Sequence, residues 1–143
     1  MKVNFLIAEE VRPEANGKVT ILGLFAGDII LLVKGAQPEG VAANKPVGLE
    51  RLAILVIIGE TEGEHKFKGK LVEPSGTLYK SELPLGEATL KKGFNHTIVV
   101  ELKPFIVKKE GIFNFEFFVD DQKFTFPFEI RERNLLNDEL TSE

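Results

Sequence analysis

Hydrophobic and polar residues alternate along much of this chain, most clearly in a stretch rich in phenylalanine between Gly111 and Ile130. The phenylalanines that keep this alternation are Phe113, Phe115, Phe117, Phe124, Phe126 and Phe128. Because successive side chains of a strand point to opposite faces, each run predicts a strand with one buried face. Asp120, Asp121 and Gln122 between the runs are typical turn residues. The stretch therefore predicts a β-hairpin whose phenylalanine side covers a core.

The loop of this hairpin must contain an even number of residues, because odd-numbered rings on the first strand have to share a face with even-numbered rings on the second. A two-residue loop, Asp120-Asp121, would place Phe117 opposite Phe124 and Phe115 opposite Phe126. A four-residue loop over residues 120–123 would instead place Phe117 opposite Phe126. We favour the four-residue loop, because Asp-Asp lacks the glycine that a tight primed turn prefers.

Two residues of the hairpin carry information about its neighbours. Pro127 has no N–H group to donate, which predicts that the strand from Phe124 to Ile130 lies at a sheet edge or is bulged there. Phe118 has the parity opposite to the buried rings, and the exposure of a large aromatic side chain is unfavourable. We expect Phe118 to be covered by the other side of a packed sheet, by the C-terminal tail, or by a second copy in a weak homodimer.

The rest of the chain contains further apolar or alternating runs, separated by turns rich in Gly, Pro and Asn. The expected strands are residues 3–11, 19–25, 29–33, 49–59, 65–73, 77–83 and 97–102, with loops at 34–48 and 84–93. The run 49–59 is apolar on both faces, which favours a central strand. The pattern indicates an all-β fold, an immunoglobulin-like antiparallel β-sandwich of about nine strands. We expect one sandwich domain over residues 1–130 and an acidic C-terminal tail over residues 131–143.

Composition narrows the class of protein. The chain of 143 residues has no cysteine, which excludes disulfides and thiolate metal sites. Its net charge is −4, and Lys66, Lys68 and Lys70 form its nearest approach to a basic patch, which we interpret as the solvated side of a strand. We therefore expect no nucleic-acid partner. The longest apolar run, Leu52 to Ile58, is far shorter than a membrane span, and the N-terminus is not that of a signal peptide, so we expect no membrane partner and a cytoplasmic protein.

Residues able to perform chemistry are few. His65 and His96 each lie near a predicted strand start, and a site based on either would need a carboxylate beside it in space. No phosphate loop, dinucleotide fingerprint or zinc-ligand spacing is present, so we expect no cofactor, no metal and no enzymatic activity. Asp120-Asp121 could contribute to a calcium site at the hairpin tip, but calcium requires six to eight oxygens, and turn residues are the preferred interpretation.

The candidate binding residues are Glu9, Glu10, Arg12 and Phe118. Glu9 has the core-facing parity of Phe5, and an inward carboxylate must be solvated or paired, so Glu9 is expected where the sandwich opens. Glu10 shares a face with Arg12, which makes an ion pair between them plausible. A five-residue connection over residues 12–16 would place Phe5 opposite Gly23 and leave room for the ring.

The N-terminal stretch resembles the opening of a family of small bacterial proteins of uncharacterised function, on the residues Leu6-Ile-Ala-Glu-Glu-Val-Arg12 and Asn16-Gly-Lys-Val-Thr-Ile-Leu-Gly-Leu-Phe25. The phenylalanine hairpin is similar to the last two strands of that family. The resemblance implies an all-β fold and supplies no activity. The expected function is therefore a non-enzymatic protein-interaction or structural module. The alternative is a module that binds a small ligand or a carbohydrate with its end loops, although sugar platforms usually use Trp and Tyr rings, and a hydrolase ranks third.

Overall fold

The fold is taken from a computed structural model, which describes residues 1–34 and 47–134. Within these ranges the chain forms eleven strands, one short 3-10 helix and no α-helix, so the fold is all-β. The elements are β1 (Lys2–Pro13), η1 (Ala15–Gly17), β2 (Val19–Leu24), β3 (Ile29–Lys34), β4 (Val47–Leu49), β5 (Leu52–Gly59), β6 (Gly63–Val72), β7 (Leu83–Leu90), β8 (His96–Leu102), β9 (Phe105–Val107), β10 (Gly111–Val119) and β11 (Gln122–Asn134). Most of the loop predicted at 34–48, and residues 135–143 of the predicted tail, lie outside the described ranges.

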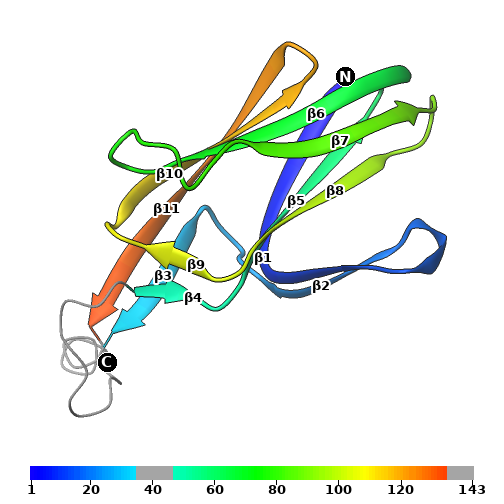
Figure 1. The fold of residues 1–143 in the computed structure, drawn as a ribbon. Helices are drawn as coiled ribbons and strands as arrows, with labels where there is room; N and C mark the ends of the chain where they lie inside the picture. The colour runs from blue at the N-terminus through cyan, green and yellow to red at the C-terminus, as the bar shows by residue number, and fades with distance from the viewer. Residues whose placement is uncertain (35–46, 135–143) are drawn as a thin grey trace.

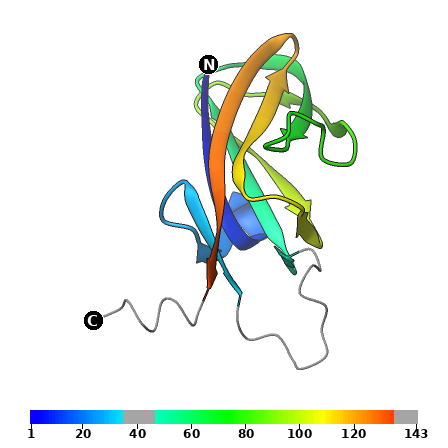
Figure 2. The same ribbon diagram turned by 90° about the vertical axis from the view of Figure 1, so that its left-hand side faces the viewer.

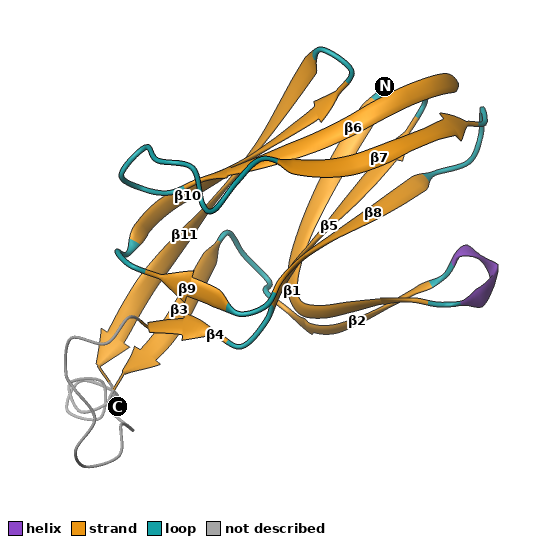
Figure 3. Ribbon diagram, viewed as in Figure 1, coloured by secondary structure: helices purple, strands orange, loops and turns teal. Residues whose placement is uncertain are grey.

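Two sheets lie face to face and form the body of the molecule (Figures 1 and 3). One has the strand order β2-β1-β5-β8, and the other has the order β3-β11-β10-β6-β7. A small sheet of β4 and β9 lies near the C-terminal end of β11 (Figure 1). Every pair is antiparallel except β3 with β11, which run parallel. The part of the chain that is described thus has eleven strands in three sheets, where about nine antiparallel strands were predicted.

The core between the two sheets is built on the phenylalanine ladder. Phe113, Phe115, Phe117 and Phe128 are at most 1% exposed, as the alternation predicts. Phe5 of β1 reaches them from the facing sheet: its ring lies edge-on to Phe115 and Phe117, with centroids 6.1 and 6.2 Å away, and stacks on Phe126 at 5.3 Å. Edge-to-face and offset ring pairs add to the free energy that burial already supplies. Phe5 therefore joins the two sheets through one aromatic cluster.

β5 is covered on both faces, as its two-sided apolar pattern predicts. Its inward side chains join the main core, while Ala53 and Leu55 point outward and are also 0% exposed. The cover comes from a bend in β1, which pairs with β5 only as far as Ala8 and then continues with β2 alone. This β1–β2 arm (residues 9–24) turns away from the sheet in Figure 1, and its Val11 and Ile21 pack with Leu55 in a second, smaller cluster.

The hairpin loop has two residues, so the predicted even number is correct and the preference for four is wrong. Phe117 lies opposite Phe124, and Val119 lies opposite Gln122. Asp120 takes a positive φ of 54°, which asparagine and aspartate tolerate better than most residues. The side chain of Asp120 also accepts two hydrogen bonds, described below, and these stabilise a turn that lacks glycine.

The edge predicted from Pro127 is confirmed for one half of its strand. β11 pairs with β3 only from Glu129 to Asn134. Pro127 lies before that stretch, in a part of β11 that has a described strand on one side alone, where a missing N–H is tolerated. The prediction is wrong for Glu129 and Ile130, which pair with β10 on one side and with β3 on the other. β11 also continues four residues beyond Ile130, where the domain was predicted to end.

β7 occupies most of the segment 84–93, for which a loop was predicted. Its alternation is interrupted: Leu83 and Leu85 pack against the core before Gly86, and Ala88 and Leu90 do so after it. Gly86 has a φ of +86°, and the pairing of β6 with β7 shifts register in the same region. This irregularity changes the parity midway, which hides the strand from a period-two pattern. No helix in the described part of the chain is long and apolar enough to cross a membrane.

Candidate functional site

The predicted pair of Glu10 and Arg12 forms, and a second arginine joins it. Arg12 Nη2 lies 3.1 Å from Glu10 Oε2, and Arg51 Nη1 lies 2.5 Å from Glu10 Oε1. Arg51 also approaches Glu101 Oε1 of β8, at 3.7 Å from its Nε atom. The hydrogen bond from Arg12, together with the positive charges of both arginines, lowers the pKa of Glu10 below its ordinary value. The cluster ties the bend of β1 to the start of β5 and to β8.

Glu9 is exposed, and it follows Ala8, the last residue of β1 that pairs with β5. The predicted register was wrong, because β1 and β2 pair with Glu10 opposite Leu22 and with Arg12 opposite Thr20. Gly23 therefore lies beside Glu9 and not beside Phe5: a Cβ at Gly23 would approach the Glu9 Cδ atom to 2.7 Å. The glycine makes room for a carboxylate at the bend, and it has the positive φ of 65° that the bend requires.

A hollow of about 470 Å³ opens beside this cluster. Its lining residues are Glu9, Glu10, Leu22, Leu49, Glu50 and Arg51. Glu10 and Arg51 neutralise each other there. Among the described residues no group of three or more His, Asp or Glu side chains is arranged to hold a metal ion. The contacts of Glu10 support a structural role for the cluster.

Phe118 is half-buried, and part of its cover is one that the sequence analysis did not predict. Residues 135–143 of the predicted tail lie outside the described ranges, and a second copy stays a prediction. The ammonium groups of Lys68 and Lys70 lie over its ring, 5.1 and 5.6 Å from the centroid. Both lysines come from β6, which pairs with β10 so that Phe118 lies opposite Lys68. The solvated lysine face predicted from Lys66, Lys68 and Lys70 is thus also the cover of this aromatic ring, through cation–π contacts.

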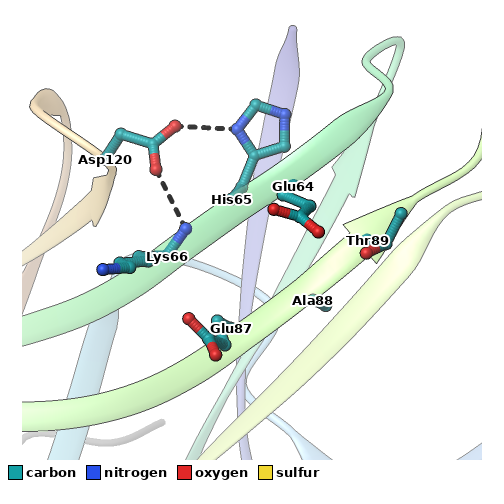
Figure 4. A pocket seen from close by; sticks show the side chains of 7 residues that line it. All are labelled: Glu64, His65, Lys66, Glu87, Ala88, Thr89 and Asp120. Atoms are coloured by element: carbon teal, nitrogen blue, oxygen red, sulfur yellow. Dashed lines mark hydrogen bonds and ion pairs between the residues drawn. The ribbon is translucent and has the colours of Figure 1, made fainter.

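A second polar cluster brings together two residues that the sequence indicated separately. His65 Nδ1 lies 2.8 Å from Asp120 Oδ2, and the backbone N–H of Lys66 donates to Asp120 Oδ1 at 2.9 Å. Figure 4 shows both contacts at the start of β6, with the side chain of Asp120 reaching across from the β10–β11 turn. The sequence analysis required a carboxylate beside a histidine for any histidine-based site, and this is where the fold supplies one.

The contacts of Nε2, the second ring nitrogen of His65, bear on whether the ring can accept a proton. Nε2 lies 3.1 Å from the carbonyl oxygen of Glu62 and 3.3 Å from Thr61 Oγ1. A carbonyl and a carboxylate only accept hydrogen bonds, so the contacts with Asp120 and with Glu62 favour the imidazolium form, in which both ring nitrogens donate. Asp120 and then the Glu62 carbonyl raise the pKa of His65, against the opposing effect of burial. In that form the ring has no free lone pair to accept a proton from Thr61.

A hollow of about 450 Å³ lies against this cluster. It is lined by Glu64, His65, Lys66, Glu87, Ala88, Thr89 and Asp120 (Figure 4). None of these side chains is aromatic except the imidazole of His65. The other histidine is elsewhere: His96 stacks on Phe67 with ring centroids 5.5 Å apart. The contact between His65 and Asp120 therefore connects the start of β6 to the hairpin turn.

Sequence reasoning missed the meeting of His65 with Asp120 and the contribution of Arg51. Fifty-five positions separate His65 from Asp120, and only the pairing of β6 with β10 brings them together. That pairing places Val119 opposite Phe67, so the next residues, Asp120 and Lys66, become neighbours. The alternation of both strands could show which of their side chains share a face. It could not show that β6 and β10 pair with each other.

No family model and no curated protein matches the chain. Parts of larger solved structures resemble its fold at low identity. One is the alkylpurine DNA glycosylase AlkC of Pseudomonas fluorescens bound to DNA, at 12% identity and a TM-score of 0.43, over 89% of this chain and 30% of that one. Another is a β-glucosidase of Listeria innocua, at 9% identity and a TM-score of 0.42, over 93% of this chain and 16% of that one.

A third is a family 123 glycoside hydrolase of Clostridium perfringens, at 12% identity and a TM-score of 0.41, over 94% of this chain and 28% of that one. The chain thus spans less than a third of the length of each of these proteins. The resemblance to small bacterial all-β proteins stays a prediction.

Proposed function

We propose that the protein is a non-enzymatic interaction module, an immunoglobulin-like β-sandwich of the cytoplasm that binds an extended segment of a protein partner along open sheet edges. The observation that carries the proposal is the character of β2 and β3. These consecutive strands are edges of the two facing sheets, and Val19–Leu24 and Ile29–Val33 contain no charged residue. Both present large apolar side chains to solvent; their exposed members are Leu22, Leu24, Ile29 and Leu31.

Such edges fit a partner that adds a strand. The backbone groups on the free side of an edge strand supply main-chain hydrogen bonds, and alternate side chains supply specificity. Leu22 and Leu24, 40% and 51% exposed, lie two residues apart on β2, and Ile29 and Leu31, 43% and 47% exposed, have the same spacing on β3. That spacing matches the period of an extended chain.

The contacts of the polar residues support a role without catalysis. One ring nitrogen of His65 contacts the Asp120 carboxylate and the other contacts the Glu62 carbonyl, and Glu10 is neutralised by two arginines. Ser75, which the sequence places in a turn, bonds to the Thr77 hydroxyl at 2.8 Å. Each of these polar groups is therefore engaged by another part of the chain.

The alternative, a carbohydrate-binding module, has less support. The chain has a single tyrosine and no tryptophan. Tyr79 is 5% exposed: its ring packs on Phe105, and its hydroxyl accepts a hydrogen bond from the Ile106 N–H. It is therefore part of the core and cannot act as a stacking platform for a sugar ring.

A peptide-display selection on the immobilised protein tests the proposal. Random extended peptides that bind the wild-type protein should lose binding to the double variant Leu24→Lys/Leu31→Lys and keep it to the control Leu78→Lys, which changes a leucine 41% exposed outside both edges. A glycan array probed with the same protein should remain empty. Peptides that bind the double variant as well as the wild type, or a specific glycan signal, would contradict the proposal.

A further inference from the structure

β3 is an edge strand with little protection against pairing with another chain over most of its length. Native edges are guarded by charges, prolines or distortions of the strand. β7 contains Pro84 and Glu87, β8 contains Glu101, and β2 contains Gly23 at a φ of +65°. Ile29–Val33 of β3 has no charged residue, proline or glycine. β3 carries its one charged residue, Lys34, at its C-terminal end, so the five residues before it lack all of these protections.

The free side of β3 offers apolar surface together with backbone groups. β3 pairs with β11 on one side, and no described strand pairs with its other side (Figure 2). Ile30 and Leu32 point into the core, while Ile29 and Leu31 are 43% and 47% exposed on the outer face. A strand added here would cover the outer face as well as the open backbone.

We propose that the occupant of this edge is a second copy of the same chain, with β3 pairing antiparallel to β3 about a twofold axis at Leu31. The inference rests on the proposed function, because it names the partner of one of the edges proposed above. Charge selects the second copy and its register. In this pairing Asp28 lies opposite Lys34 of the second copy at both ends, with five apolar residues between them. Opposite charges across a strand pair stabilise it, and like charges destabilise it.

Other registers lose this complementarity. A shift by one or two positions in either direction places both Asp28 and Lys34 opposite uncharged residues. The twofold register also brings Leu31 against Leu31 of the second copy, so that the exposed leucine is covered by its own equivalent. A twofold interface uses the same patch on both subunits, as this one does. The two five-stranded sheets would join edge to edge into one continuous sheet.

Sedimentation velocity over a concentration series tests the dimer. The wild-type protein should shift from monomer to dimer as its concentration rises. Leu31→Lys should remain monomeric over the same range, because it places two ammonium groups together at the axis. The control Leu78→Lys, at a leucine of similar exposure outside β3, should follow the wild type. Circular dichroism establishes that each variant is folded.

Charge exchange tests the register. Asp28→Lys and Lys34→Asp should each weaken self-association by about tenfold, because each change places like charges at both symmetry-related pairs. The double variant Asp28→Lys/Lys34→Asp should recover it. A mixture of the two single variants should form a heterodimer, because every lysine then faces an aspartate. This last measurement does not depend on either variant associating with itself.

The results separate this inference from the proposed function. A wild-type protein that stays monomeric at millimolar concentration, or a dimer indifferent to Leu31→Lys and to both charge reversals, would overturn the inference. Edge-dependent peptide binding by such a protein would still support the interaction module. A dimer that shows the charge exchange, with no peptide selected at either edge, would support the inference and limit the module to self-association.

Discussion

At the scale of single residues, His65 and Asp120 couple the fold to pH. The pKa of His65 is raised above its ordinary 6.5, chiefly by Asp120. Its contribution to stability is therefore fully present below pH 6.5 and is lost as the pH rises through the raised pKa. The pKa of Asp120 is lowered from 3.8, first by the Lys66 N–H and then by His65, so its contribution is lost as the pH falls below 3.8. The melting temperature should therefore fall at both ends of the pH range, below pH 3.8 and above the raised pKa of His65.

Asp120→Asn tests the origin of that profile. The amide keeps a side chain that tolerates positive φ but removes the charge that pairs with His65. We expect the variant to have a lower melting temperature than the wild type near pH 6. Above pH 6 its melting temperature should change less with pH. Asp121→Asn, a matched change at the neighbouring exposed residue, should leave both unchanged. Equal effects of the two variants would show that the net charge of the turn, and not the contact with His65, sets the profile.

Phe115 is one of the fully buried rings of the phenylalanine ladder. It is 0% exposed and lies against Phe5 and Phe117. Phe115→Ala should lower the free energy of unfolding by about 3–5 kcal/mol, because it removes buried ring contacts and leaves a cavity. Phe94→Ala, at a ring 71% exposed, should change it by less than about 0.5 kcal/mol. Urea denaturation of both variants measures the difference.

At the scale of elements, the pairing of β6 with β10 depends on a glycine. A Cβ at Gly69 would lie 2.9 Å from the ring of Phe115, which is 0% exposed and packs against Phe5 and Phe117. Gly69→Ala should therefore destabilise the protein by about 1–3 kcal/mol through overpacking. Gly27→Ala, at a glycine with open space around it, is the control and should be close to neutral. A Gly69→Ala variant as stable as the wild type would mean that the strand pair can separate to admit the methyl group.

The elements also show how far the sequence alone can lead. Period-two alternation identified the hairpin and the strand β8, because each buries side chains at regular intervals, and an apolar run on both faces identified β5. Alternation failed at β7, where Gly86 changes the parity. The predicted β1–β2 register was wrong because the two strands continue to Pro13 and Val19, so that the connection lies at residues 14–18 and not at 12–16. Alternation reports which face of a strand is buried; it does not report which strand lies alongside. The contacts His65–Asp120 and Arg51–Glu10 depend on strand order, and so they required the structure.

At the scale of the whole molecule, we expect the fold to be independent of metal ions. The chain has no cysteine, and the described residues contain no cluster of three or more potential ligands among His, Asp and Glu. EDTA should leave the melting temperature unchanged. A calcium-dependent rise of several degrees that Asp120→Ala abolishes would show that the hairpin turn binds the ion.

The β1–β2 arm affects the order in which parts of the molecule unfold. Its apolar contacts form a cluster distinct from the phenylalanine core, and beyond Ala8 it is held to the body by that cluster and by the Arg51–Glu10 ion pair. The arm is therefore a cooperative unit that can open at a lower free energy than global unfolding. Opening would uncover Ala53 and Leu55 on an otherwise intact sheet. Its amides should then exchange with solvent sooner than those of β10, and the partly open form would carry an apolar face that the closed form conceals.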